Sequence, residues 1–440
     1  MTGGGIVSQG TVIHGEVRGN DIDFIVIRGT ADGGNNQGIA LGSTGIVESD
    51  SSLTLIGSAA GTGEAIFQSG ISGGIFSNGS SNLSILSTSG DIDIGNLTIA
   101  NSSGSMISLT NPADDFVTLG QLNIAGSLSV VGSDGNNTIT FTDDSYNHAL
   151  ITIDGGIGND LVDFSNITTG PVNFLSSSAS NVENVVGSQD SNDTLTGSAG
   201  NDVFTINGMN SGNHGSLVFA DFENLNGAAG NDAFTFLPGG DLDGTVNGGS
   251  GMADLLFIDN RTDPISRNYI VTDGQIIGSQ YDFANIEMID IGAGNGSDTV
   301  VTDFFPAFSQ TLNGGNGTDS VTFSSNANNG SSPYTSSDGQ AVTIADFETV
   351  SFQNSGSTQQ PTGLTNSNQS NGDSGAILQN ETNTVGSDTP GNRDDGNNMV
   401  NNFNEEDRNS SSSDGIRIMV DADGDGVDDD TGAFLAADGN

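Results

Sequence analysis

The stretch Gly-Gly-Ile-Gly-Asn-Asp-Leu-Val, residues 155–162, decides the fold of this chain. A glycine-rich turn ends in Asn-Asp and leads into a short apolar strand, and the same pattern returns at residues 197–204 and 227–234. Glycine permits the tight turn, and a recurring unit of this kind indicates one small structural element that is stacked many times. The sequence therefore predicts an all-β fold, a parallel, right-handed β-helix or β-solenoid.

The aspartates that close these turns indicate the length of the repeat. In chain order they are Asp160, Asp193, Asp202, Asp232, Asp254, Asp298 and Asp319. The differences between successive positions are irregular, but the steps that end at Asp254, Asp298 and Asp319 are all close to one common length or to twice that length. We therefore expect rungs of about 22 residues with Gly-Asn-Asp turns over residues 121–354.

Residues 1–120 follow a longer repeat. Ile25-Val26-Ile27 is echoed by Leu53-Thr54-Leu55 and then by Leu83-Ser84-Ile85. Within the same units, Gly45-Ile46-Val47 resembles Gly74-Ile75-Phe76. Short alternating strands without a helical pattern predict β-helix rungs of about 28–30 residues, with alternate residues of strands 25–27 and 53–55 facing inward.

A second marker accompanies the later turns. Asp221-Phe222-Glu223-Asn224-Leu225 is matched by residues 282–286 and 346–350. Each step between these copies is close to three of the shorter rungs. We therefore predict that Phe222, Phe283 and Phe347 stack in one column inside the fold.

The C-terminal part has a different composition. Residues 355–413 are rich in Asn, Ser, Gly and Asp and poor in apolar residues, which predicts a disordered linker. Residues 414–440 form an acidic segment in which carboxylates hold positions 1, 3, 5 and 9 of an EF-hand-type loop: Asp421, Asp423, Asp425 and Asp429. Position 12 is Gly432 instead of an acid. The loop therefore resembles thrombospondin type-3 or dockerin calcium loops, and we expect it to bind Ca²⁺.

Two of the glycine turns match a known repeat at every position. Residues 155–163 and 314–322 read Gly-Gly-x-Gly-x-Asp-x-apolar-x, and so resemble the hemolysin-type, RTX-like calcium-binding repeat. That resemblance implies Ca²⁺ held between turns nine residues apart, with these candidate ligands: Asp160, Asp193, Asp202, Asp232 and Asp319. Only Asp193 and Asp202 show that spacing. The alternative is that each Asn-Asp pair hydrogen-bonds the local backbone.

Over residues 20–354 the arrangement is similar to filamentous-hemagglutinin-like bacterial surface and secreted adhesins. The phrase Phe222-Glu223-Asn224-Leu225 before a Gly-Asn-Asp turn carries this resemblance. It implies an extracellular or cell-surface location. No secretory signal is visible in residues 1–20, so we expect a piece of a larger polypeptide or a C-terminal export route.

The composition restricts the partners. Of 440 residues 66 are Gly, none is Cys, and 55 acids oppose seven Arg, giving a net charge of −48. Such charge repels nucleic acid and anionic membranes, and no apolar run reaches the ~18 residues of a membrane span. Carboxylate-rich surfaces suit a calcium-containing medium, although acidity for solubility alone is the alternative.

The sequence therefore predicts a non-enzymatic, structural and adhesive repeat region, stabilised by calcium. Its partner would be a host or neighbouring-cell surface or a polysaccharide. One alternative is a carbohydrate-active β-helix, a polysaccharide lyase or hydrolase, but His14, His148 and His214 are scattered and the chain has no Lys. Another is a passive, metal-free spacer.

Overall fold

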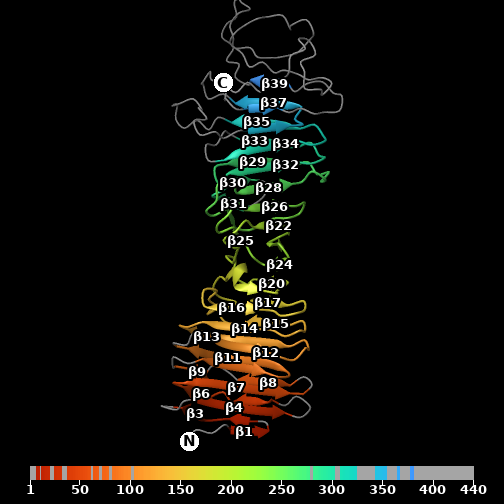
Figure 1. Cartoon of the computed structure of the whole chain (residues 1–440). Coiled ribbons are helices and arrows are strands. Elements are labelled where there is room, and N and C mark those ends of the chain that lie inside the picture. Colours follow the sequence, from red (N-terminus) through yellow and green to blue (C-terminus); the bar gives the residue numbers. More distant parts are fainter. Residues whose placement is uncertain are drawn as a thin grey trace, which may run out of the picture.

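The protein is all-β over the residues that its structure, a computed structural model, describes. These are residues 6–9, 11–19, 24–31, 37–60, 63–68, 72–78, 82–100, 104–277, 281–302, 308–324, 342–353, 364–366 and 377–380. The regular elements there are strands, apart from one 3₁₀ turn, Ser176–Ser178. A helix that could cross a membrane does not occur among these residues. Figure 1 shows the strands stacked along one long axis. Long parallel sheets of this kind are compatible with a β-helix.

The first sheet runs along the N-terminal half. Its strands, in spatial order, are β1 (Ile6–Gln9), β4 (Phe24–Ala31), β7 (Ser52–Ala59), β10 (Leu83–Ser87), β12 (Ser105–Leu109), β14 (Leu128–Val131), β16 (Ile151–Asp154) and β19 (Ala179–Ser180). Ile25 pairs in parallel with Leu53, and Leu53 with Leu83, so these three strands follow one another at the longer step. Ile85 pairs with Ile107, so by this point the step has already shortened to that of the later rungs.

A second sheet begins as two parallel series. The strands β2 (Thr11–Ile13), β5 (Ile39–Leu41) and β8 (Glu64–Gln68) form one, and β3 (Glu16–Gly19), β6 (Ile46–Ser49) and β9 (Gly74–Ser77) form the other. The long strands β11 (Asp91–Ile99) and β13 (Phe116–Ile124) continue both series. Val47 pairs with Ile75, so the predicted match of residues 45–47 with 74–76 is wrong by one residue. Val47 and Ile75 are both fully buried, and a one-residue slip would turn each outward.

In the C-terminal half the chain alternates between the second sheet and a third. The second sheet continues through β15 (Thr138–Phe141), β17 (Leu161–Asp163), β20 (Asn184–Val186), β22 (Val203–Gly208), β24 (Leu217–Ala220), β26 (Ala233–Phe236), β28 (Leu255–Asp259), β32 (Met288–Gly292), β34 (Ser309–Asn313), β36 (Val342–Ala345) and β38 (Leu364–Asn366). The third sheet contains β18 (Asn173–Leu175), β21 (Thr194–Thr196), β25 (Asn224–Asn226), β27 (Thr245–Asn247), β31 (Tyr281–Ala284), β33 (Thr299–Thr302), β35 (Ser320–Ser324), β37 (Thr349–Gln353) and β39 (Ile377–Asn380).

The shorter rung predicted from the aspartates is present in this half. Phe234 pairs with Leu256 in the second sheet, and Val300 pairs with Val321 in the third. Strands β38 and β39 lie within the range predicted as a linker and pair in parallel with β36 and β37. The rest of residues 355–440 lies outside the described residues.

Two antiparallel insertions interrupt the parallel order. In the second sheet β23 (Ser211–His214) lies between β22 and β24 and runs antiparallel to both. In the third sheet β30 (Gln275–Ile277) is placed in the same way between β29 (Asn268–Thr272) and β31. The first insertion lengthens the step from Asp202 to Asp232, so it exceeds the next step, from Asp232 to Asp254. In addition, the Gly-Asp turns as a group precede strands of two different sheets. Together these features explain the irregular spacing of the aspartates.

Inward-facing side chains form one continuous core along the stack. Phe222, Phe283 and Phe347 are all buried there, but they do not share one column. Phe283 continues the column of Leu225 and Val246, whereas Phe222 precedes β25 and packs edge-on against Phe219. The predicted single phenylalanine column is therefore wrong, because the middle copy of the marker was aligned three residues out of register.

Candidate functional site

In several turns the first glycine lies close against the backbone of the next rung. A Cβ on Gly155 would lie 1.9 Å from the carbonyl oxygen of Asn181, and one on Gly187 would lie 1.8 Å from that of Asp221. Gly156, the next residue along, has a φ of 101°, which favours glycine. Close approach and backbone conformation together therefore explain the Gly-Gly start of the turn.

The aspartate that ends the turn connects neighbouring rungs. The Oδ1 of Asp160 accepts the backbone N–H of Asn137 in the preceding rung at 2.6 Å. The N–H of Asp160 donates to the Oε2 of Glu183 in the following rung at 2.8 Å. Asp160 is only 1% exposed, so these contacts supply partners that its buried polar groups need.

The same contact recurs along four series, which we name the carboxylate ladders. Each backbone N–H donates to the carboxylate one rung further on, at 2.5 to 2.9 Å. The ladders are Asn137–Asp160–Glu183, Val172–Asp193–Glu223, Asp202–Asp232–Asp254–Glu287 and Arg267–Asp298–Asp319–Glu348. All four end in a glutamate.

The glutamate belongs to a turn of its own type. Two residues before it lies an Asn or Asp with φ between 50° and 58°: Asn181, Asp221, Asn285 and Asp346. These residue types adopt the left-handed conformation more readily than most others. The true repeat of the second marker is therefore residues 285–289 and not 282–286, and its shared feature is the glutamate that ends a ladder.

The asparagine of each Asn-Asp pair reaches in the opposite direction. The Oδ1 of Asn201 accepts the N–H of Asn231 in the following rung at 2.9 Å, and the Oδ1 of Asn231 accepts that of Met252 at 3.2 Å. The Oδ1 of Asp232 meanwhile accepts from the preceding rung, from the N–H of Asp202. One dipeptide thus connects its rung to both neighbours.

The second carboxylate oxygen has two environments. In Asp193 and Asp202 it accepts the N–H of a serine, Ser188 or Ser198, that follows the first glycine. In five others it is buried and has no hydrogen-bond partner among the described residues: Asp160, Asp232, Asp254, Asp298 and Asp319. All five of these turns carry a residue of positive φ at the serine position: Gly156, Ala228, Gly249, Gly294 and Gly315.

Burial disfavours the charge on these carboxyl groups. It is the main cause that raises the pKa of Asp160, Asp193, Asp232 and Asp298. It also raises the pKa of Asp319 to about 6, and the acidic neighbours Asp298, Glu348 and Asp346 contribute to that rise.

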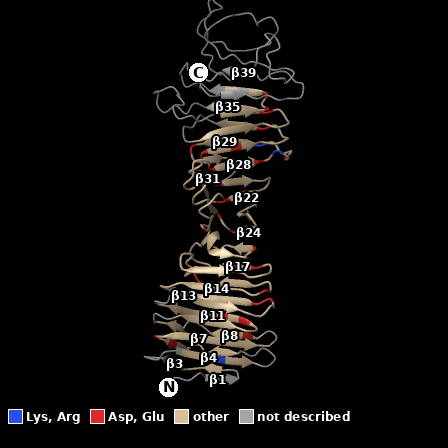
Figure 2. Cartoon of the chain, in the orientation of Figure 1, with Lys and Arg blue, Asp and Glu red and all other residues tan. Residues whose placement is uncertain are grey.

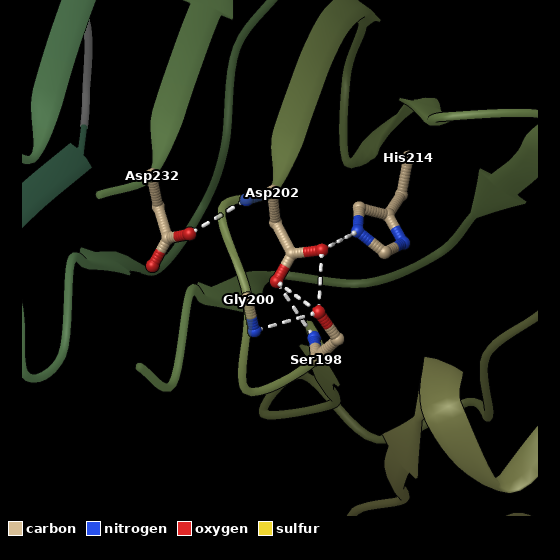
Figure 3. A network of polar contacts seen from close by, with 5 residues as sticks. All are labelled: Ser198, Gly200, Asp202, His214 and Asp232. Carbon is tan, nitrogen blue, oxygen red and sulfur yellow. Dashed lines mark hydrogen bonds and ion pairs between the residues drawn. The ribbon is translucent and has the colours of Figure 1, made fainter. Parts of the chain in front are cut away.

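Figure 3 shows the polar network around Asp202. The Oγ of Ser198 lies 3.1 Å from both carboxylate oxygens, and the Nε2 of His214 lies 3.0 Å from Oδ1. His214 also stacks on Phe204, with ring centroids 4.4 Å apart. The aspartate lies between the serine and the histidine, whereas a catalytic triad places the histidine between the other two. The arrangement therefore differs from a catalytic triad, and the contact of His214 with Asp202 anchors β23 to the turn.

The predicted calcium ligands lie at turns that lead into two different sheets. Asp160, Asp202 and Asp232 precede strands of the second sheet, and Asp193 and Asp319 precede strands of the third. Asp193 and Asp202, nine residues apart, thus belong to different ladders. Calcium takes six to eight oxygens, and no three His, Cys, Asp or Glu side chains among the described residues are grouped to hold a metal.

The C-terminal candidates Asp421, Asp423, Asp425 and Asp429 lie outside the described residues. Calcium at either place stays a prediction. In Figure 2 acidic residues lie mostly at the turns along the stack, and basic residues are few.

Sequence reasoning did not find a groove on the corner that joins the first sheet to the second. Its volume is about 410 Å³, and it is lined by the turns after β12, β14, β16 and β19, including Pro112, Asp134, Asp154, Ile157 and Asn181. Three of these turns have six residues and the fourth has three. The groove lies where the turn length changes, which only the strand pairing reveals.

Comparison with protein-family models, curated proteins and solved structures finds no match to this chain.

Proposed function

We propose that this chain is a structural and adhesive repeat region of a large secreted or cell-surface bacterial protein, folded as a right-handed parallel β-solenoid. The observation that carries the proposal is the series of carboxylate ladders, which connect rung to rung at the corners of the stacked sheets. A stack held in this way suits a long stalk or display surface. The adhesive part rests on the resemblance to filamentous-hemagglutinin-like repeats.

The elongated architecture can be tested in solution. Small-angle X-ray scattering of the whole chain should give an extended pair-distance distribution with the cross-section of a single stack. A compact, near-spherical distribution would contradict the stalk. Adhesion is a separate measurement: beads coated with the chain should attach to bacterial or host cell surfaces or to immobilised polysaccharide, and beads coated with an unrelated acidic protein should not.

Calcium stabilisation is the second part of the proposal. A cation that binds only the folded chain adds RT ln(1 + [L]/Kd), about 2.7 kcal/mol at a hundredfold excess over Kd. Melting curves of the whole chain with calcium and with a chelator should therefore differ. If they superimpose, the metal-free spacer is the better description.

Variants of the whole chain locate the metal. Substituting Asp421, Asp423 and Asp425 together by Asn should abolish the calcium response if the C-terminal loop is responsible. Asp160→Asn and Asp232→Asn test the turns, because Asn keeps one oxygen for the ladder hydrogen bond while removing the charge. A calcium response that survives all of these changes would place the ion elsewhere.

A further inference from the structure

The groove between the first and second sheets has an unusual balance of hydrogen-bonding groups. Four side chains that line it carry donors, and each already donates within the protein: Thr110 to Ser87, Asn111 to Asp115, Ser133 to Asn137, and Asn181 to Asp154. The backbone N–H of Ile157 is likewise bonded, to the carbonyl of Ser133. The amides of Asn111 and Asn181 each keep a second N–H, but the only charged groups in the lining are carboxylates, so the groove is negative and rich in acceptors.

Two carboxylates supply these acceptors. Asp154 receives the N–H of Gly156 and the amide of Asn181 on the same oxygen, Oδ1, which leaves Oδ2 for a ligand. Asp134, in the neighbouring turn, is exposed and has no hydrogen-bond partner among the described residues. Both carboxylates line the groove, although the register places Asp154 beside Val131 and Asp134 further along its turn, beside Ile157. No Arg lines the groove.

Apolar surface completes the site. Ile157 is 70% exposed at the tip of its turn, and the exposed ring of Pro112 lies in the same lining. An exposed isoleucine in a glycine turn contributes nothing to the core, yet here it borders two carboxylates. The groove thus combines anionic acceptors with a short aliphatic surface.

We propose that this groove binds an alkylammonium group, with the nitrogen between Asp134 and Asp154 and the methylene chain against Ile157. An ammonium group has three donors and no acceptor, which matches a lining of acceptors. Carboxylates bind such donors through charge-assisted hydrogen bonds, and the net charge of −48 draws cations toward the chain. The group could come from a small polyamine or from a lysine side chain of a partner. The site does not depend on the proposed adhesive role.

Calorimetric titration of the full chain tests the proposal. Putrescine represents the free amine, and N-acetyl-lysine methylamide represents the protein side chain. Butanediol and N-acetyl-norleucine methylamide are the uncharged counterparts. Saturable binding of at least one amine, without binding of its counterpart, supports the site and identifies the source. Absence of binding by both amines overturns it.

Matched variants separate this site from the general attraction of cations to an acidic chain. The pair Asp134→Asn and Asp154→Asn should weaken amine binding by about tenfold or more. Asn is tolerated at position 154, because Asn226 and Asn247 accept the equivalent turn N–H elsewhere. The control pair Asp143→Asn and Asp144→Asn removes the same charge outside the groove and should have little effect.

Ile157→Ser should weaken binding without altering charge. Equal losses in the two double variants would show nonspecific attraction and overturn the proposal. Calcium binding that requires Asp134 and Asp154, in the absence of amine binding, would overturn it too.

Discussion

The backbone N–H of Asp232 donates to the Oδ1 of Asp254, 2.7 Å away in the next rung of the second sheet. Neither residue is part of a strand, yet the contact continues the interstrand hydrogen bonding across the turn. A carboxylate is a strong acceptor for such an N–H, and the bond is stronger than its neutral equivalent. The aspartate of the repeat is therefore a structural link as well as a candidate ligand.

Gly155→Ala should destabilise the stack. The new Cβ would lie 1.9 Å from the carbonyl oxygen of Asn181, so one rung must shift, at a cost of about 1–3 kcal/mol. Gly200→Ala is the control, because its Cβ would meet only the Ser198 hydroxyl, at 3.5 Å. Denaturant unfolding of both variants gives the comparison. Equal stability would mean that the rungs do not approach as closely as described.

Glu223→Ala should reduce stability by about 1–3 kcal/mol, because it leaves the buried N–H of Asp193 without an acceptor. The amide of Asn210 also loses its bond to the other carboxylate oxygen. Glu223→Gln keeps one oxygen for Asp193 and should be milder. Hydrogen exchange at the Asp193 amide provides a local readout, and exchange that is unchanged in Glu223→Ala would contradict the ladder contact.

Acidification should stabilise the chain through Asp115. Burial, followed by the nearby Asp91, raises the pKa of Asp115 to about 6. Because the folded state holds the proton more tightly than the unfolded state, stability rises as pH falls through about 6 and levels off below the unfolded value near 4. The contribution is at most about 3 kcal/mol. Asp115→Asn should remove this part of the pH profile of unfolding, whereas Asp114→Asn, which removes only the smallest of the contributions that raise this pKa, should keep most of it.

Arg267 should have the opposite pH dependence. Its guanidinium hydrogen-bonds Asp263 and lowers the pKa of that carboxyl. The resulting stability is present above the unfolded pKa of Asp263 and is lost as pH falls through the lower folded value. Arg267→Met should therefore cost about 1–3 kcal/mol near neutral pH and much less in strong acid.

Arg261→Met is the matched control for Arg267→Met. Arg261 pairs with Asp259 with most of its side chain exposed, and exposed ion pairs contribute little. If both arginine variants lose the same stability at neutral pH, burial of the Asp263 pair is not what gives it strength.

The sequence predicted the regular parts of the fold. Alternating strands such as 53–55 identify inward residues because the side-chain period of a strand is two, and Leu53 and Leu55 are fully buried. The Gly-Asn-Asp turns were correctly taken as equivalent units. The Asp-to-backbone hydrogen bonds that the sequence offered as an alternative to metal binding are present, although they join neighbouring rungs and not only the local turn.

The irregular parts could not be predicted in the same way. Strand β23 reads Ser-Gly-Asn-His and carries no alternating apolar pattern, so nothing marked the antiparallel insertion. Each glutamate that ends a ladder lies a full rung or more beyond its aspartate in the sequence, and their partnership depends on which sheet each turn precedes. The groove depends on differences in turn length between neighbouring rungs, which have no signal in any single turn.

In Asn-Asp pairs such as Asn231-Asp232 the Asn oxygen accepts from the following rung and the Asp oxygen accepts from the preceding one, so the two ends of the stack are not equivalent. At the C-terminal side of an incomplete stack, the Asn oxygen and the Asp N–H of the last Asn-Asp turn have no hydrogen-bond partner until the next rung is added. The other face of the same rung presents the Asp carboxylate oxygen instead. The two faces therefore differ chemically, and a rung can join the stack in only one orientation with these contacts satisfied.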